Sequence, residues 1–280
     1  MPRELTPCQT AERSIIKTYR KVLWNPFVAA VKRYELTAPN DRIAVCISGG
    51  QDSVLLAKLM QELQRRSDRP FELVFLVMDP GYAPENRRLI EENARLLEIP
   101  VTIFNSDIFD VTVQVDKNPC YLCARMRRGS LYAKAQELGC SKIALGHHFN
   151  DVVETTLMAL LYGAQIQAMP PKLHSKNFPG MELIRPLYCV HEDDIIAWKN
   201  YNHLRFLQCA CRFTEARDTA EDGVGQSKRQ EMKLLLREMR RTNPNVEKSI
   251  FAAIHGVQLD TMVGVKFRGK EYSFLDYYDR

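Results

Sequence analysis

The sequence predicts an α/β fold with a doubly wound parallel sheet. Short apolar runs typical of buried strands alternate with longer segments in which apolar residues recur at helical spacing. Repeated strand–helix units of this kind build a parallel sheet that is covered on both faces. In addition, a glycine-containing loop joins one apolar run directly to the start of a helix. We expect a ligand at such a strand end, because open α/β sheets bind ligands beyond the carboxyl ends of their strands.

The expected elements begin with a helical segment over 11–33, which Pro26 kinks or divides. The sheet region follows, and we expect its elements in this order: strand 42–47, helix 52–66, strand 71–78, helix 85–97, strand 100–104, helix 121–138, strand 142–145 and helix 150–162. The proline-rich stretch 163–190 predicts a loop with one strand near 182–185. Three more helices are expected, at 191–203, 227–241 and 244–254.

Bulk composition is that of a globular protein with a mild basic bias. The 280 residues are 45% hydrophobic and 26% charged, with a net charge of +5. That charge permits an RNA partner without requiring one. No apolar run approaches the roughly 18 residues that a membrane span needs, and residues 1–20 lack a signal-peptide core. We therefore expect a cytoplasmic protein that does not contact a membrane.

The most specific motif is the loop that follows the strand expected at 42–47. A strand, a glycine turn and a helix start present backbone N–H groups at the positive end of a helix dipole, which receives a phosphate. The spacing matches neither the dinucleotide-binding fingerprint nor the P-loop. The predicted phosphate-binding residues are Ser48, Gly49, Gly50, Gln51, Asp52 and Ser53.

A second motif follows the strand expected at 142–145 and runs from Gly146 into a helix. Its carboxylates, Asp151 and Glu154, are three residues apart and so share a helix face. Carboxylates at this place can hold Mg²⁺ against nucleotide phosphates, because Mg²⁺ prefers hard oxygen ligands. The alternative is an ordinary helix cap followed by an acidic first turn.

The eight cysteines are not a disulfide framework if the protein is cytoplasmic. Cys46 and Cys140 lie in or beside apolar runs and are predicted core residues. Four others occur in close pairs, and the first pair is followed by arginines that favour thiolates. An iron–sulfur cluster, a structural zinc and a redox dithiol all remain open on spacing. The paired cysteines are Cys120, Cys123, Cys209 and Cys211.

Together these motifs resemble the pyrophosphate-loop ATPases, and within them the tRNA 2-thiocytidine biosynthesis family. The resemblance covers about residues 15–255 and rests on the Ser-Gly-Gly-Gln-Asp-Ser loop, the Pro-Cys-Tyr-Leu-Cys-Ala-Arg segment and the Gly-His-His segment. It implies the adenine-nucleotide alpha-hydrolase (HUP-like) fold with additions at both ends. The expected divisions are a helical segment 1–38, an ATP-binding domain 39–205 and a helical extension 206–280 that carries the third cluster ligand.

The family resemblance also implies cofactors and site residues. It implies a [4Fe-4S] cluster on Cys120, Cys123 and a third ligand, either Cys209 or Cys211, because this chain has Cys-x-Cys where the family tends to show Cys-x-x-Cys. It implies ATP bound by the 48–53 loop and Gly146, with the adenine near Val77, Met78 and Asp79. Asp151 would serve Mg²⁺ and phosphate. Arg127 stands where related thiolases have a basic residue near the reacting centre, and it would stabilise charge.

The implied activity is an ATP-dependent tRNA sulfurtransferase. It would adenylate the C2 oxygen of a cytidine, cytidine 32 in the anticodon loop, and replace that oxygen with sulfur. The expected partners are tRNA, a sulfur donor (a cysteine desulfurase or sulfide) and a second copy of the chain in a homodimer. Two alternatives stay open: sulfur transfer to a small molecule or carrier protein, and a non-enzymatic nucleotide sensor that holds iron–sulfur or zinc.

Overall fold

The computed structural model describes residues 4–106, 119–207, 228–276 and 278, and gives only the backbone for 119–124. The chain forms two compact units. The first contains residues up to Val152 and those from Met169 to 207, and the second contains Val153–Ala168 and the residues from 228 onward. In the part that is described, no helix combines the length and the apolar character that crossing a membrane requires.

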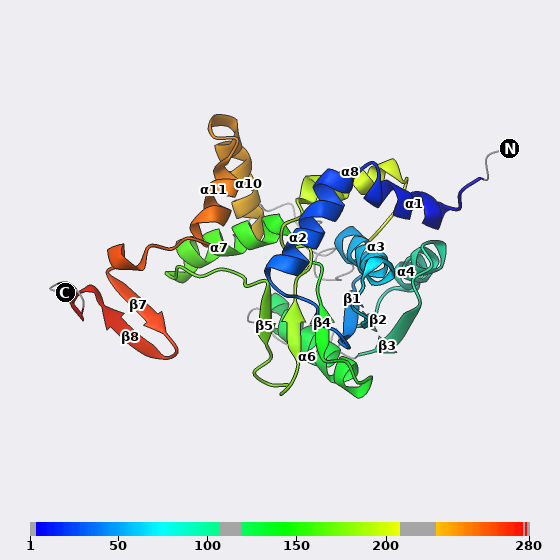
Figure 1. Cartoon of the computed structure of the whole chain (residues 1–280), viewed down its shortest axis with the longest axis horizontal. Helices are drawn as coiled ribbons and strands as arrows, with labels where there is room; N and C mark the ends of the chain where they lie inside the picture. The colour runs from blue at the N-terminus through cyan, green and yellow to red at the C-terminus, as the bar shows by residue number, and fades with distance from the viewer. Residues whose placement is uncertain (1–3, 107–118, 208–227, 277, 279–280) are drawn as a thin grey trace. The chain divides into compact units, whose positions relative to one another are not determined.

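The first unit is built on a six-stranded sheet with the order β3-β2-β1-β4-β6-β5 (Figure 1). The neighbours are parallel, except that β5 runs antiparallel to β6 at one edge. The predicted parallel sheet is therefore confirmed, and β5 is an addition that the sequence analysis did not predict. The strands are β1 (Arg42–Ile47), β2 (Glu72–Asp79), β3 (Val101–Asn105), β4 (Lys142–Ala144), β5 (Lys172–His174) and β6 (Glu182–Ile184).

The helices agree closely with the predicted ones. Each strand from β1 to β4 is followed by a helix wherever the chain is described, as the alternating pattern required. The helices that start in the first unit are α1 (Pro7–Ile16), α2 (Asn25–Arg33), α3 (Gln51–Arg66), α4 (Pro84–Leu96), α6 (Pro119–Glu137), α7 (Phe149–Gly163) and α8 (Glu192–Tyr201).

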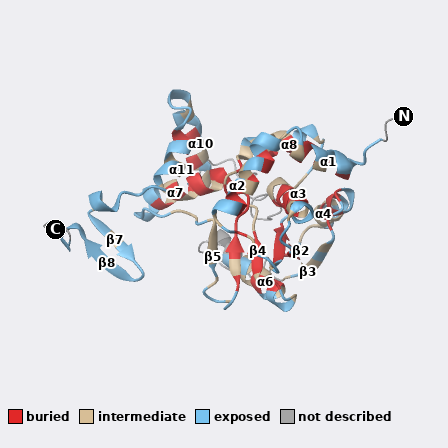
Figure 2. Ribbon diagram, in the orientation of Figure 1, coloured by how far each residue is buried: buried red, intermediate tan, exposed pale blue. Residues whose placement is uncertain are grey.

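The core of the first unit divides at the sheet because alternate strand residues point to opposite faces. In β1, Val45 packs in the larger cluster with α3, α8 and the N-terminal helices, while Cys46 packs in a smaller one with residues of α6. Cys46 and Cys140 both belong to this smaller cluster, which confirms that they are core residues. Figure 2 shows the buried strands and helix faces in red.

The N-terminal helical segment is divided, as expected, but into three pieces. A π-helical turn, η1 (Arg20–Trp24), separates α1 from α2. Pro26 occupies the first turn of α2, where its missing N–H would have had no helical partner. Phe27 and Ile15 are fully buried in the same cluster as Val45 of β1. These helices therefore complete the core on the face of the sheet that α3 covers.

The second unit contains part of α7, two further helices and a hairpin. The helices are α10 (Lys228–Thr242) and α11 (Val246–Ala253), close to the predicted positions. The hairpin, β7 (Gly264–Phe267) with β8 (Lys270–Ser273), was not predicted. Its two-residue turn has positive φ at Arg268 and Gly269, which fits the right-handed twist of the strands. Figure 2 shows the hairpin almost entirely exposed.

Candidate active site

The predicted phosphate loop is a closed turn between β1 and α3. The backbone N–H of Ser48 donates to Ser53 Oγ at 3.1 Å, and that hydroxyl donates to the carbonyl of Gly50 at 2.8 Å. Gly49 has φ of +85°, a left-handed conformation that glycine adopts without strain. A Cβ on Gly49 would lie 2.7 Å from Ile90 Cγ1. The glycine is therefore required both by conformation and by space.

The helix start beyond this turn is suited to an anion. Gly50 is the N-cap of α3 in an extended conformation, and it has no side chain with which to cap the helix. The N–H groups of the first turn, Gln51 to Ser53, have no intrahelical acceptor. Together with the helix dipole they favour a phosphate at this position.

The second motif lies directly against the first. An ideal Cβ on Gly146 would lie 3.1 Å from the backbone nitrogen of Ser53, and 3.2 and 3.3 Å from the carbonyl carbon and oxygen of Asp52. These neighbours are backbone atoms, so they cannot move aside as a side chain would. β1 and β4 are adjacent in the sheet, and strand order reverses there. The structure therefore brings the two predicted motifs together at the switch point of the sheet.

Asp151 takes part in a reciprocal cap at the start of α7. The backbone N–H of His148 donates to Asp151 Oδ2 at 3.0 Å, and the backbone N–H of Asp151 donates to His148 Nδ1 at 3.4 Å. This pattern is a capping box with histidine in place of serine or threonine. Asp151 therefore caps the helix from its third residue, with His148 in place of the expected Asp or Asn N-cap, and the magnesium role of Asp151 stays a prediction.

Glu154 lies one turn further along α7, within the second unit. Its side chain is 2% exposed and pairs with Arg229 at 3.1 Å and Lys233 at 3.8 Å, both from α10. Another basic residue of α10, Arg240, pairs with Glu247 at 2.7 Å. These three basic residues of α10 are therefore paired with carboxylates of the same unit.

The predicted adenine position is at the end of β2. Val77 lies beside Ile47 in the parallel ladder, one strand away from the phosphate loop. Val77 and Met78 are 1% and 3% exposed, so their side chains belong to the core. The strand end is near the loop as predicted, and the adenine contact itself stays a prediction.

Asp79, the last residue of β2, holds the next turn in place. It accepts from the backbone N–H of Tyr82 at 2.8 Å and from Arg87 Nη1 at 2.8 Å. Burial opposes ionisation of Asp79, but these donors prevail and lower the pKa of its carboxyl below its ordinary value. The Tyr82 hydroxyl in turn donates to the carbonyl of Ser48 at 3.5 Å. Sequence analysis placed Asp79 near the adenine but gave its carboxylate no role, although a carboxylate at a strand end is the pattern that would have found one.

The structure places the first cysteine pair at the start of α6. The backbone of Cys120 and Cys123 lies in the first turn of this helix, and the cluster that they would hold stays a prediction. Arg127, four residues after Cys123, is half-buried. Cys209 and Cys211 lie outside the described residues. Among the side chains that are described, no three His, Cys, Asp or Glu residues gather closely enough to hold a metal ion.

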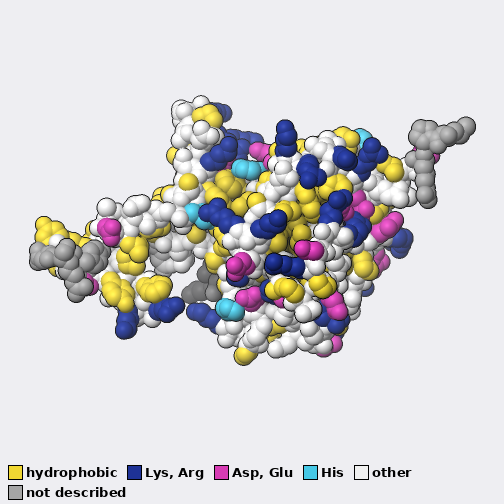
Figure 3. All heavy atoms as spheres, viewed as in Figure 1, with side chains coloured by type: hydrophobic (Ala, Val, Ile, Leu, Met, Phe, Trp, Pro, Cys, Tyr) yellow, Lys and Arg dark blue, Asp and Glu magenta, His cyan; other side chains and the backbone are white. Residues whose placement is uncertain are grey.

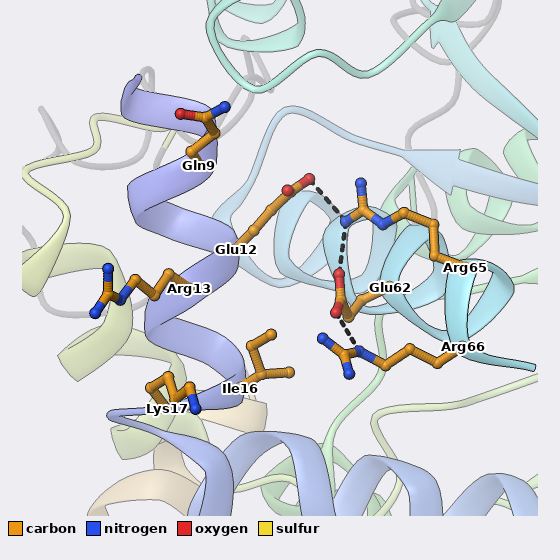
Figure 4. Close-up of a pocket in the computed structure, with 8 residues that line it drawn as sticks. All are labelled: Gln9, Glu12, Arg13, Ile16, Lys17, Glu62, Arg65 and Arg66. Atoms are coloured by element: carbon orange, nitrogen blue, oxygen red, sulfur yellow. Dashed lines mark hydrogen bonds and ion pairs between the residues drawn. The ribbon is translucent and has the colours of Figure 1, made fainter. Parts of the chain in front are cut away.

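A pocket of about 570 Å³ lies away from these motifs, between α1 and the last turns of α3 (Figure 4). Arg65 bridges Glu12 and Glu62 at 2.9 and 2.6 Å, and Arg66 pairs with Glu62. Both carboxylates of the lining are thus paired, while Arg13 and Lys17 leave the pocket with an excess of positive charge. Figure 3 shows basic and acidic side chains interspersed on the visible face of the first unit.

The fold and the joined loops define an α/β protein in which a glycine turn and a helix start suited to an anion lie at the switch point of the sheet. The model of the PP-loop domain family matches residues 18–211. The chain is 36% identical over 249 residues to the tRNA-cytidine(32) 2-sulfurtransferase of Alkalilimnicola ehrlichii, covering 87% of this chain and 75% of that protein. It is 34% identical over 244 residues to the protein of the same name from Geobacter sulfurreducens, covering 86% and 91%.

A solved structure shares the fold. It is the U34-tRNA thiolase NcsA from Methanococcus maripaludis with its [4Fe-4S] cluster, with a TM-score of 0.65, 19% identity, and 86% and 80% of the two chains covered. This chain belongs to the PP-loop family, and within it to the family of the tRNA-cytidine(32) 2-sulfurtransferases.

Proposed function

We propose that this protein is an ATP-dependent tRNA sulfurtransferase that converts a cytidine, cytidine 32 of the anticodon loop, to 2-thiocytidine. One structural observation carries the proposal: the close approach of Gly146 to Asp52 and Ser53, which joins both motifs into one nucleotide site. The substrate and the reaction are those named for the relatives described above.

Each part of the joined site has a task. The backbone N–H groups from Gln51 to Ser53 would hold the β- and γ-phosphates of ATP, and the Gly49–Gly50 turn lets those phosphates approach the backbone. The adenine would lie against the end of β2 near Val77 and Met78. These donors are fixed before the reaction, so they stabilise charge on the leaving pyrophosphate without reorganising.

The chemistry needs ATP because the C2 oxygen of cytidine is a poor leaving group. That oxygen would attack the α-phosphorus, with pyrophosphate leaving. Sulfur would then form a bond to C2, the C2–O bond would break, and AMP would depart with the oxygen and the electron pair. An unpaired cytidine in a tRNA loop enters a pocket more easily than a paired base does.

The sulfur step would involve the cysteine helix. Cys120 and Cys123, with Cys209 or Cys211, would hold the [4Fe-4S] cluster, and Arg127 on the same helix would stabilise negative charge at the reacting centre. When bound by three thiolates, such a cluster supplies one open iron that can hold a sulfur atom. The sulfur donor would be a cysteine desulfurase or sulfide.

Asp151 and Glu154 are the proposed magnesium ligands, and each can be replaced by its amide. Asp151→Asn and Glu154→Gln are expected to raise the Mg²⁺ concentration that gives half-maximal ATP binding. Glu238→Gln, a change at an exposed residue of α10, serves as the control. If Glu154→Gln melts earlier but keeps the wild-type Mg²⁺ midpoint, Glu154 acts only as the partner of Arg229 and Lys233.

The proposal also places the protein in the cytoplasm, where tRNA is modified and thiols stay reduced. A homodimer is part of it. Exposed apolar side chains on the second unit support an interface there, among them Val263 at 78% and Leu275 at 67% exposure.

The decisive test combines tRNA analysis with metal analysis. We expect 2-thiocytidine in tRNA from cells that carry the gene and its loss on deletion, with restoration by wild-type protein. Cys120→Ala should fail to restore it, while Cys140→Ala, in the buried core, should succeed. Protein purified without oxygen should contain iron and sulfide.

Each alternative predicts a different result. Unchanged 2-thiocytidine after deletion would favour a small-molecule or carrier-protein substrate. ATP binding without pyrophosphate release, even with sulfide and tRNA present, would favour a nucleotide sensor. One equivalent of zinc without iron would contradict the cluster.

A further inference from the structure

A buried arginine stands at the carboxyl end of β6. Arg185 is only 5% exposed, although arginine is rarely buried without a partner. Its Nη1 donates to the carbonyl of Pro170 at 2.5 Å, and its backbone N–H donates to Pro171 at 2.9 Å. Its Nε is also buried and has no hydrogen-bond partner among the described residues. A buried donor without an acceptor destabilises the folded protein. A bound ligand with an acceptor atom at this position would remove that cost.

The sheet places this arginine beside the nucleotide loop. β6 pairs with β4, with Ile184 beside Ala144, and the backbone N–H of Leu145 donates to the carbonyl of Ile184 at 3.0 Å. Arg185 is therefore one strand spacing, about 4.8 Å, from the chain that leads into Gly146. Gly146 itself touches the first turn of α3.

The side chain of Arg185 lies on the same side of the sheet as α6. Residues two apart in a strand share a face, and Leu183 packs with Tyr132 of α6 in the smaller core cluster. Tyr132 and Arg128 of α6 both interact electrostatically with Arg185. The guanidinium thus lies within electrostatic range of α6 on one side and of Asp151, at the start of α7, on the other.

The surrounding charges do not neutralise this guanidinium. Burial, and to a smaller degree Arg128, lowers the pKa of Arg185 to about 10, while Tyr132, Tyr188 and Asp151 oppose that shift. Arg185 forms no ion pair with a carboxylate in the described part of the chain. An anion bound at this point would supply the missing counter-charge.

We propose that Arg185 binds the α-phosphoryl group of the nucleotide and positions it between the 48–53 loop and α6. A guanidinium presents two parallel N–H donors to two phosphoryl oxygens, a geometry that lysine cannot reproduce. In the adenylated intermediate, Arg185 then holds the phosphoryl group that joins adenosine to the C2 oxygen of cytidine. That phosphoryl group later leaves as part of AMP. A tRNA backbone phosphate is the competing ligand, and the binding measurements below distinguish the two. This inference rests on the proposed function.

The test compares ligands with and without the phosphoryl group. Isothermal titration of the full-length protein, prepared without oxygen and without tRNA, would measure dissociation constants for AMP and adenosine. Arg185→Lys and Arg185→Gln should weaken AMP binding about 10- to 100-fold and leave adenosine binding within twofold. Arg42→Gln is the control. Arg42 is exposed at the amino end of β1, whereas Arg185 lies at the carboxyl ends of the strands.

The outcomes separate this inference from the proposed function. Equal losses for AMP and adenosine would show a merely structural role, and unchanged AMP binding with weaker tRNA binding would show a contact with tRNA; either overturns the inference alone. If Arg185→Gln fails to fold, Arg185→Lys decides, because it keeps the charge and loses the paired donors. A wild-type protein that binds neither ATP nor AMP would overturn the proposed function itself.

Discussion

Replacing Gly146 with alanine should weaken nucleotide binding from a position that need not touch the nucleotide. The added methyl group would lie 3.1 Å from the nitrogen of Ser53 and 3.2 Å from the carbonyl carbon of Asp52. Gly146 does not have a positive φ, so alanine is not excluded by conformation. The whole effect should come from the contact, which forces the first turn of α3 away from β4 by a few tenths of an ångström.

The magnitude follows from two effects. Overpacking against backbone lowers the free energy of unfolding by about 1–3 kcal/mol. Alanine also restricts the unfolded chain, and this effect offsets about 0.4–1 kcal/mol of that loss. The shift also misdirects N–H groups that would donate to charged phosphates, each worth about 1.5–3 kcal/mol. Losing one such bond corresponds to a rise of about 10- to 100-fold in the dissociation constant for ATP.

The assay is calorimetric titration of ATP into the purified protein without tRNA, together with thermal unfolding. Gly163→Ala is the matched control, because its new Cβ would meet only Met158 O at 3.9 Å, an ordinary contact. ATP binding by Gly146→Ala within twofold of wild type would refute the view that close approach of the two motifs sets the loop geometry.

Two further perturbations test the same site. Gly49→Ala should lower the unfolding free energy by about 2–4 kcal/mol in chemical denaturation, because it adds left-handed strain to a 2.7 Å contact with Ile90; a loss below about 1 kcal/mol would contradict this. Asp79→Asn should destabilise most at neutral pH. The folded-state pKa of Asp79 lies below its ordinary 3.8, so its stabilising effect is present above that pH and is lost as the pH falls through the folded pKa. Melting curves of wild type and variant should therefore converge below about pH 4, and a gap that widens there would show the opposite sign.

Local sequence patterns predicted the elements of the sheet well. β1 is observed over Arg42–Ile47, as expected, because a continuous apolar run that ends in Ser-Gly-Gly has few alternatives. The helix that follows it was predicted from residue 52 and begins at Gln51. In both cases the residues that decide the structure are neighbours in the chain.

The elements that were missed depend on distant partners. β5 is three residues long and exists only by pairing with β6, so no period can show in its sequence. The strands of the β7–β8 hairpin have four residues each, so the alternation of Val265 and Phe267 is too short to mark a strand. The reciprocal cap of His148 and Asp151 was offered only as an ordinary cap, since histidine is not among the preferred cap residues.

The sequence by itself determined the glycine turn after β1 and the order of strands and helices, because glycine conformation, helix starts and apolar periods are local properties. It also placed Cys120 and Cys123 at the start of the helix expected over 121–138. Only the tertiary structure decided that Gly146 touches Asp52 and Ser53, that Glu154 faces Arg229, and that Arg185 is buried beside the loop. Those contacts join residues far apart in the chain, and the packing of β1, β4 and β6 into one sheet is what brings the residues at the strand ends together.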